Sequence, residues 1–321
     1  MHKVIKKITD TIKTNKSFLV TSHMSLEGDA LGSELALYLL LKNLQKKVVI
    51  CNNDPTPFIY KFLPATNFIK NKLYDRYFDV GIVLDCSDIS RTGKVKDYFN
   101  RVRLIINIDH HISNTYFGDI NWVDTKASST CQMLYTLFRK FRFMDKKIAL
   151  CLYTGIFTDT GSFKYANTNS RSHRIVSDLL SYGITSHKVD EQLSSLCTPE
   201  DLHFIGKVLS MLKFDEHKKI CWVKLKKWEE HDYDLTEIIF SILRLLKGVE
   251  VFVLFKKVDK NKIRVNFRSR SSVDVNKIAQ FFGGGGHKCA SGTTIEDTLE
   301  NAENKVISFI RKYTNGFIKQ R

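Results

Sequence analysis

Three short runs of apolar residues in the first half of the chain limit its fold more than any other feature. They read SFLVTSH at 17–23, FDVGIVLD at 78–85 and VRLIINID at 102–109. The last two are apolar on successive residues, which is typical of strands covered on both faces of a parallel sheet. Predicted helical segments between the strands, including 57–63 and 127–141, alternate with them in a βαβ pattern. We therefore predict an α/β fold with a doubly wound, mainly parallel sheet over residues 1–185.

The second half of the chain shows a different pattern, in which strands are joined by tight turns. VEVFVLFKKVDKNKIRVNFRSR predicts two antiparallel strands that meet at DKNK, and KKICWVKLKK predicts a third. VDVNKIAQFF predicts a helix, GTTIE a short strand, and the final residues a basic amphipathic helix. At 321 residues the chain exceeds the usual size of one core. We predict a smaller α+β domain with a mixed sheet over 202–321, joined to the first domain by a polar linker at 186–201.

The charge and the cysteine content narrow the classes of protein further. A formal charge of +16 and a pI near 9.4 favour an acidic partner such as a nucleotide or nucleic acid, although lysines spread along a chain are more often solvated surface. The seven cysteines form no CxxC pair, which predicts reduced thiols. No apolar run reaches the roughly 18 to 20 residues that cross a bilayer. We expect a cytoplasmic protein without a membrane segment, and the sequence leaves monomer and homodimer open.

Polar side chains follow the three apolar runs at the point where each predicted strand ends. His23 follows the first strand, Asp85 ends the second, and Asp109, His110 and His111 end the third. Ligands of an open parallel sheet bind beyond the carboxyl ends of its strands. We therefore expect these side chains to meet at one edge of one sheet.

Three more carboxylates belong to the same candidate site. Glu27 and Asp29 lie in the loop HMSLEGDALGS, which connects the first strand to its helix, and Asp159 ends a helical run in GIFTDTGSF. Each has a simpler explanation when taken alone. Asp29 would be the N-cap of a helix beginning near Ala30, Glu27 a charge at the positive end of that helix, and Asp159 a turn former.

The set as a whole favours a metal centre over these separate explanations. Carboxylates gathered at one sheet edge raise each other's pKa unless a cation neutralises them. A mixture of oxygen and imidazole ligands suits Mn²⁺ or Mg²⁺ better than a structural zinc ion. The number of candidate ligands is large enough for two cations. Enzymes that hydrolyse phosphoryl groups often use paired cations about 3.5 to 4 Å apart.

At these residues the chain resembles the DHH/DHHA1 phosphoesterases, and within them the branch of oligoribonucleases and 3′-phosphoadenosine 5′-phosphate (pAp) phosphatases. The resemblance spans nearly the whole chain. It rests on HMSLEGDALGS, VLDCSD, DHHISN and FTDTGSF, followed by VNFRSRSSVDVNKIAQFFGGGGHKCASG. It implies hydrolysis of short RNA oligonucleotides to mononucleotides, with removal of the 3′-phosphate of pAp as a second activity. A phosphodiesterase acting on cyclic-di-AMP or pApA is the alternative.

The resemblance also implies a cofactor and a role for each motif residue. The cofactor would be two divalent cations, Mn²⁺ before Mg²⁺ or Co²⁺. One cation would be held by His23, Glu27 and Asp85, and the other by Asp29, Asp85, His110 and Asp159, with Asp85 bridging the two. His111 would act near the substrate phosphate as a general acid or charge stabiliser, and Asp109 would orient the histidines.

One departure from the family pattern falls in the first motif. The family has aspartate where Glu27 stands and proline where Leu26 stands. The extra methylene moves the carboxylate outward by about one bond length. An altered first cation site, or a nucleotide-binding protein with weakened activity, is the alternative that this departure leaves open.

The glycine-rich segment and the strand before it carry the candidate substrate-binding residues. Strand alternation in IRVNFRSR places its arginines and Asn266 on one face, which solvated charge would also explain. GGGGH at 283–287 is longer than a helix C-cap requires, and backbone without side chains can approach a phosphate closely. The resemblance favours a nucleotide clamp here. Its residues are Arg268, Arg270, Gly284, Gly285 and His287.

Overall fold

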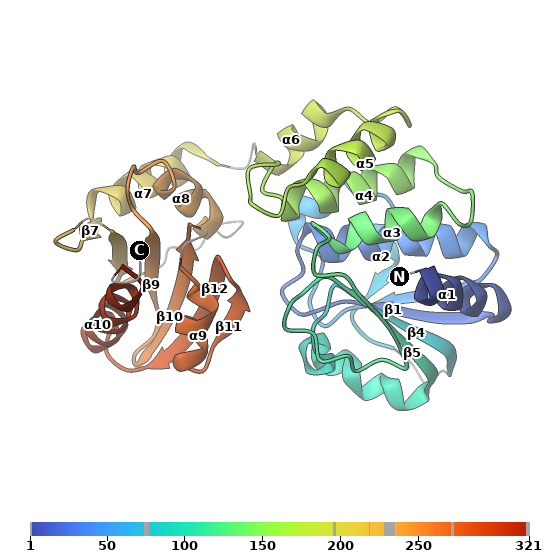
Figure 1. Cartoon of the computed structure of the whole chain (residues 1–321), viewed down its shortest axis with the longest axis horizontal. Coiled ribbons are helices and arrows are strands. Elements are labelled where there is room, and N and C mark those ends of the chain that lie inside the picture. Colours follow the sequence, from blue (N-terminus) through green and yellow to red (C-terminus); the bar gives the residue numbers. More distant parts are fainter. Residues whose placement is uncertain are drawn as a thin grey trace. The chain divides into compact units, whose positions relative to one another are not determined.

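The computed structural model describes residues 2–73, 77–194, 197–217, 219–227, 235–270 and 273–318. The chain divides into two compact units, residues 1–195 and 196–321, and each has a sheet of its own (Figure 1). Every helix in these described ranges falls short of the length or apolarity needed to cross a membrane.

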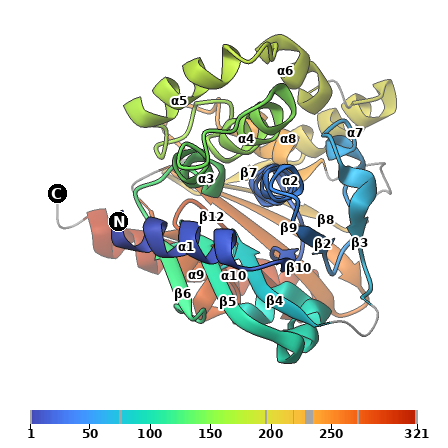
Figure 2. The same ribbon diagram turned by 90° about the vertical axis from the view of Figure 1, so that its right-hand side faces the viewer.

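Unit 1 is built on a six-stranded sheet in which all strand pairs are parallel (Figure 2). Its strands are β1 (Ser17–Thr21), β2 (Lys47–Cys51), β3 (Ile69–Lys70), β4 (Phe78–Leu84), β5 (Val102–Asp109) and β6 (Ile120–Val123). They lie in the order β3-β2-β1-β4-β5-β6, so the winding reverses between β1 and β4. This confirms the predicted doubly wound sheet. Its carboxyl edge beside the reversal is where such folds bind ligands.

Helical segments cover both faces of this sheet. They are α1 (His2–Thr14), α2 (Gly28–Asn43), α3 (Thr130–Phe138), α4 (Lys146–Asp159), α5 (Ser170–Leu180) and α6 (Ser186–Ser194), with the 3₁₀ segments η1 (Phe58–Tyr60), η2 (Thr66–Phe68) and η3 (Ile89–Arg101). Phe18 and Val20 of β1 pack in the larger core with the α-helices, whereas Leu19 packs on the other face with Phe99 of η3. Alternate residues of one buried strand therefore serve two cores, which explains its continuous apolar sequence.

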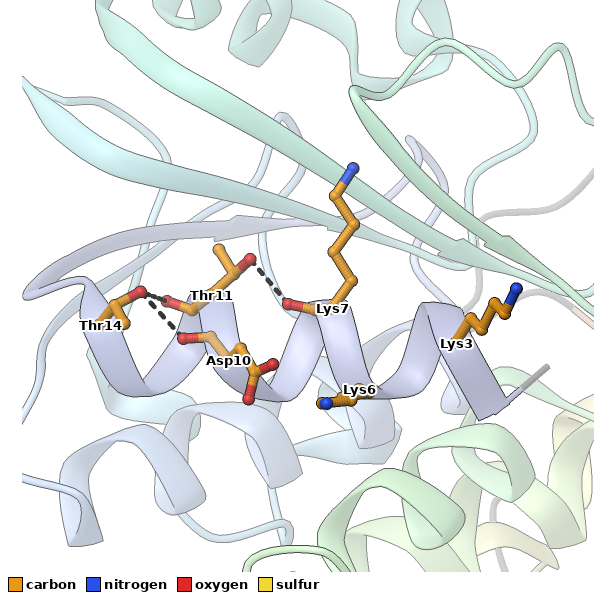
Figure 3. A pocket seen from close by; sticks show the side chains of 6 residues that line it. All are labelled: Lys3, Lys6, Lys7, Asp10, Thr11 and Thr14. Carbon is orange, nitrogen blue, oxygen red and sulfur yellow. Dashed lines mark hydrogen bonds between the residues drawn. The ribbon is translucent and has the colours of Figure 1, made fainter.

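Helix α1 is amphipathic, as its sequence predicts. Ile5, Ile8 and Ile12 are buried. The opposite face carries a hollow lined by Lys3, Lys6, Lys7, Asp10, Thr11 and Thr14 (Figure 3). The hydroxyls of Thr11 and Thr14 bond back to carbonyls of the same helix. This hollow includes no predicted site residue and is a solvated helix face.

Unit 2 contains the mixed sheet that the sequence predicts. Its strands are β7 (Lys213–Phe214), β8 (Ile220–Leu225), β9 (Val251–Asp259), β10 (Lys262–Ser269), β11 (Gly285–His287) and β12 (Ala290–Glu296). The order is β11-β12-β10-β9-β8-β7, with β8 and β9 parallel and the other pairs antiparallel. The helices are α7 (Pro199–Ser210), α8 (Thr236–Leu243), α9 (Val275–Phe281) and α10 (Leu299–Ile318).

Two helical boundaries differ from the sequence pattern. The segment 57–63 holds only the single 3₁₀ turn Phe58–Tyr60, because Pro57 and Pro64 flank it. The polar segment 186–201 contains α6 and the start of α7, while residues 195 and 196 lie outside the described ranges. Its polar residues cap a helix. Thr198 and Asp201 form a capping box around the first turn of α7.

Candidate metal centre and substrate face

The predicted metal ligands come from separate elements and meet at the carboxyl edge of the unit 1 sheet. His23 lies just after β1, Asp85 just after β4, and His110 just after β5. Asp29 lies in the first turn of α2, and Asp159 ends α4. Segments more than a hundred residues apart in sequence thus supply one site.

The first group consists of His23, Glu27 and Asp85, whose ligand atoms all lie within 4.8 Å of one another. His23 Nε2 lies 3.5 Å from Asp85 Oδ2 and 3.7 Å from Glu27 Oε1. The Glu27 side chain is 49% exposed, so its longer chain reaches the group from the solvent side. Glu27, where the family resemblance implies aspartate, therefore keeps a carboxylate in reach of His23 and Asp85.

The second group consists of Asp29, His110 and Asp159, which also lie within 4.8 Å of one another. His110 Nε2 lies 3.6 Å from Asp159 Oδ2 and 3.9 Å from Asp29 Oδ2. The same nitrogen lies 3.4 Å from Asp85 Oδ1. This is the set of four that the family resemblance implies for the second cation.

Asp85 lies between the two groups. Its Oδ2 faces His23 and its Oδ1 faces His110, so the two oxygens of one carboxylate point to different imidazoles. Its backbone has a φ of 52°, in the left-handed region that residues other than glycine rarely adopt. The backbone N–H donates to Ile108 on the neighbouring strand and holds this conformation. Such a geometry is suited to a bridging ligand.

Burial and mutual repulsion shift the pKa of the carboxyl groups. Burial and the nearby Asp85 raise the pKa of Asp29 to about 7. Burial also raises the pKa of Asp159 well above its usual range. At Asp85 burial acts in the same direction, but His110 and His23 outweigh it and hold the pKa well below its usual value. Asp85 is therefore the carboxylate that remains ionised within the cluster.

The two imidazoles respond to these charges. Burial lowers the pKa of both His23 and His110, but the surrounding carboxylates outweigh it and raise the pKa well above its usual value. The cluster thus retains protons to balance its buried charge, and a bound cation would replace them.

The donor set fits divalent cations. Within the described residues, the buried atoms His23 Nε2 and Asp85 Oδ2 have no hydrogen-bond partner, although they lie at the centre of the first group. Buried polar atoms are usually satisfied, so such atoms indicate a ligand. Carboxylate oxygens combined with imidazoles suit Mn²⁺ better than a structural zinc ion.

His111 forms a third possible ligand group with Asp85 and His110, and it is held by a chain of buried side chains. Its Nδ1 donates to Asp109 Oδ1 at 2.6 Å. Asp109 Oδ2 accepts from Asn114 Nδ2 at 2.6 Å, and Asn114 also donates to Asn107. This fixes the ring and its tautomer. Asp109 is not among the possible metal-ligating groups of the described residues.

Asp29 is not the N-cap of its own helix. Helix α2 begins at Gly28, and its N-cap residue Glu27 makes no side-chain cap bond. The Asp29 carboxylate instead accepts from Thr130 N at 2.6 Å and Cys131 N at 2.9 Å at the start of α3. The simpler explanation of Asp29 is therefore wrong.

One buried acidic residue near the candidate metal centre was not identified from the sequence motifs. Glu34 on α2 is fully buried, and its Oε2 accepts from Asn52 Nδ2 at 2.8 Å. Burial raises its pKa to about 8, with the bond from Asn52 and the charge of His23 acting against this. A single acid inside the apolar run GSELALYLLL was the available signal.

The candidate clamp residues lie in unit 2, where the alternation of β10 is as predicted. Val265 and Phe267 are buried under α9 and α10, and Arg268 lies on the opposite face. The strand register places Arg268, Ala290 and His287 in one row across β10, β12 and β11. A single small residue, Ala290, thus separates the guanidinium from the imidazole in this row.

The two arginines of the candidate clamp have different surroundings. The Arg268 guanidinium pairs with Glu237 and lies 5.0 Å from the centre of the Phe240 ring. Arg270 donates to three backbone carbonyls near the end of α8, those of Val249, Arg244 and Leu246. Arg270 therefore closes the end of a helix, whereas Arg268 presents a planar group on the sheet.

Three of the four consecutive glycines differ in what their positions require. Gly283, with a φ of 74°, ends α9, and Gly284 N donates back to Ala279 O. A Cβ on Gly284 would lie 2.2 Å from the carbonyl of Gly292, so no side chain fits. A Cβ on Gly285 would have no heavy atom closer than 3.9 Å. Neither helix capping nor packing requires glycine at 285, so this position remains the candidate for close approach of a ligand.

The fold and the site place the chain among the phosphoesterase hydrolases, with a doubly wound sheet whose edge carries groups that could hold metal ions, and a second mixed sheet. The model of the DHH family, N-terminal domain, matches residues 17–156, and that of the DHHA1 domain matches residues 217–316. The chain belongs to the DHH family and carries a DHHA1 domain.

Relatives are similar along almost the whole chain. The bifunctional oligoribonuclease and PAP phosphatase NrnA of Thermus thermophilus is 31% identical over 91% of this chain and 89% of its own length. The protein of the same name from Bacillus subtilis is 28% identical over 89% and 91%. A crystal structure of an exopolyphosphatase-related protein from Bacteroides fragilis superposes with a TM-score of 0.89 at 29% identity, covering 99% of this chain and 98% of the other.

Proposed function

We propose that the chain is a manganese-dependent phosphodiesterase that hydrolyses short RNA oligonucleotides to mononucleotides and removes the 3′-phosphate of pAp. The observation that carries the proposal is Asp85, whose two carboxylate oxygens face His23 and His110 in two adjoining ligand groups. The Thermus thermophilus relative is named for the same two activities.

The six candidate ligands would hold two divalent cations. His23 and Glu27 would complete one site and Asp29, His110 and Asp159 the other, with Asp85 common to both. Bound there, the cations would lower the pKa of a water molecule and offset charge on the phosphate oxygens. Mn²⁺ suits this mixture of oxygen and nitrogen donors, with Mg²⁺ and Co²⁺ as weaker candidates.

His111 would be the catalytic proton donor. Because Nδ1 donates to Asp109, Nε2 is the ring nitrogen that would exchange a proton with the oxygen of the departing nucleotide. The pKa of Asp109 is lowered, since His111 outweighs the effect of burial.

Unit 2 would bind a nucleotide through the face that carries Arg268 and His287. A planar guanidinium suits a phosphate, and the backbone at Gly285 is open to close approach. Residues 1–185 would accordingly form the catalytic domain and 202–321 the substrate-binding domain. Arg270 would act indirectly, by fixing the end of α8.

A panel of substrates tests the proposal. RNAs of two to twenty nucleotides, pAp, cyclic-di-AMP and pApA would be incubated with Mn²⁺ and the wild type, Asp85→Asn or Asp97→Asn. Asp97 is exposed on η3 and serves as the matched control. We expect the wild type and Asp97→Asn to release mononucleotides from the shortest RNAs. We expect Asp85→Asn to lose every activity.

Three results would contradict parts of this proposal. Turnover confined to cyclic-di-AMP or pApA would make the protein a dinucleotide phosphodiesterase. Tight binding of RNA without product would make it a binding protein weakened at Glu27. Full activity of Asp85→Asn would exclude the metal centre described above.

A further inference from the structure

The short segment Ala127–Cys131, at the start of α3, contacts the second group of candidate ligands from several directions. The motifs do not include it, and its sequence, ASSTC, carries no metal-binding side chain apart from the thiol of Cys131. Its contacts reach Asp29, Asp85 and His110 directly and Asp159 through Asn167.

The first contact orients His110. Its Nδ1 lies 3.3 Å from the carbonyl oxygen of Ala127. A carbonyl only accepts, so Nδ1 carries the proton and Nε2 is directed at the carboxylates. Histidine ligands are commonly oriented in this way by a partner on the other ring nitrogen.

The second contact fixes Asp29. Thr130 N and Cys131 N each donate to one of its carboxylate oxygens, at 2.6 and 2.9 Å. Space for this arrangement depends on Gly155, where a Cβ would lie 2.8 Å from Asp29 Oδ1 and 2.3 Å from Cys131 Sγ. The carboxylate is thus held by two amides in a site that admits no larger residue on the facing helix.

The third contact involves the Thr130 side chain. Its hydroxyl donates to Asp85 Oδ1 at 3.0 Å, and both groups are fully buried. The same residue therefore binds Asp29 through its backbone and Asp85 through its side chain. It sets the separation of two carboxylates that come from different elements.

The fourth contact is indirect. Asn167 Nδ2 donates to the carbonyl oxygen of Ser128 at 3.0 Å and to that of Asp159 at 3.0 Å, and lies 3.4 Å from Asp159 Oδ2. The end of α4 is thereby tied to the same segment.

Helix capping accounts for only part of these contacts, because the Asp29 carboxylate also satisfies two first-turn N–H groups of α3 that have no partner inside the helix. The first turn of α3 has its own cap, since Ser129 Oγ accepts from Gln132 N at 3.0 Å. The bond from the Thr130 hydroxyl to Asp85 satisfies no backbone group of the helix. The contact with Asp85 therefore serves the carboxylate and not the helix.

We infer that Ala127–Cys131 is the element that positions the second cation site, and that the Thr130 hydroxyl is the positioning group that holds Asp85 in its bridging orientation. The inference rests on the proposed function. Loss of that hydroxyl weakens Mn²⁺ binding about 10- to 100-fold, the usual effect of removing a partner of a metal ligand.

The experiment compares isosteric variants of two buried threonines in the full chain. Thr130→Val removes the hydroxyl and keeps the shape and the backbone N–H. Thr154→Val is the control, because Thr154 Oγ1 is buried without a hydrogen-bond partner among the described residues. Thr130→Ser retains the hydroxyl. Binding of Mn²⁺ alone is measured by titration calorimetry and by its electron paramagnetic resonance signal.

We expect weaker Mn²⁺ binding in Thr130→Val, and wild-type binding in Thr154→Val and Thr130→Ser. Equal binding in Thr130→Val and Thr154→Val, or equal loss in Thr130→Val and Thr130→Ser, would overturn the inference. If Thr130→Val does not fold, Thr130→Ala replaces it, since serine and alanine leave similar space and differ in the hydroxyl. A wild type that binds no Mn²⁺ would instead refute the proposed function.

Discussion

Replacement of Glu34 by glutamine tests the electrostatics around the metal centre. Glu34 is fully buried, and Asn52 is its hydrogen-bond donor. Its pKa is about 8, against 4.5 in the unfolded chain, so the folded state binds one more proton between these values. A raised carboxyl pKa means that stability is greatest below pH 4.5 and falls as the pH rises towards 8.

The size of the effect follows from this difference. Each pH unit above the unfolded value removes about 1.4 kcal/mol, so keeping Glu34 protonated at pH 7 costs about 3 kcal/mol. Glutamine has nearly the same shape and no charge. We therefore expect Glu34→Gln to match the wild type near pH 4.5 and to be more stable by about 3 kcal/mol at pH 7.

The assay is unfolding by urea in the presence of a chelator, from pH 4.5 to pH 8. Glu191→Gln, at an exposed position of α6, is the matched control and should follow the wild type throughout. A stability difference between Glu34→Gln and wild type that does not change with pH would refute the reasoning.

Three further changes have defined outcomes. His111→Asn should lower kcat about 10²- to 10⁴-fold with Mn²⁺ affinity unchanged, as measured by steady-state kinetics and calorimetry. Glu303→Gln replaces a buried carboxylate, which is bonded to two lysines and Trp222, with a neutral amide. It should lower the unfolding free energy by about 2 kcal/mol at neutral pH. Because its pKa is lowered to about 2, this difference should shrink as the pH falls from 4.5 towards 2 in urea unfolding. Gly284→Ala should lower the thermal midpoint, whereas Gly285→Ala should leave it unchanged and raise KM.

Most of the fold follows from local sequence. The continuous apolar runs that end at Asp85 and Asp109 identify buried parallel strands, because each strand serves two cores. β3 and β11 are two and three residues long and depend on their neighbours for pairing, so no local pattern predicts them. The helical structure at 186–201 was not predicted, because the polar residues there, including those that cap α7, favoured a linker.

The candidate ligand groups could be predicted from the sequence because strand ends share one edge of a sheet. His23, Asp85 and His110 each follow a strand, and the structure brings them within 3.5 Å of a neighbouring ligand. The supporting contacts were not accessible. Thr130 acts through one hydroxyl and one backbone N–H, and neither has a sequence signature until the start of α3 is placed beside α2.

Anomalous diffraction at the manganese edge, from crystals grown with Mn²⁺, tests the central claim most directly. We expect two peaks at the carboxyl edge of the unit 1 sheet, both within bonding distance of Asp85, one also bound by His23 and the other by His110. Absence of any peak there, or a single peak that does not touch Asp85, would contradict the account.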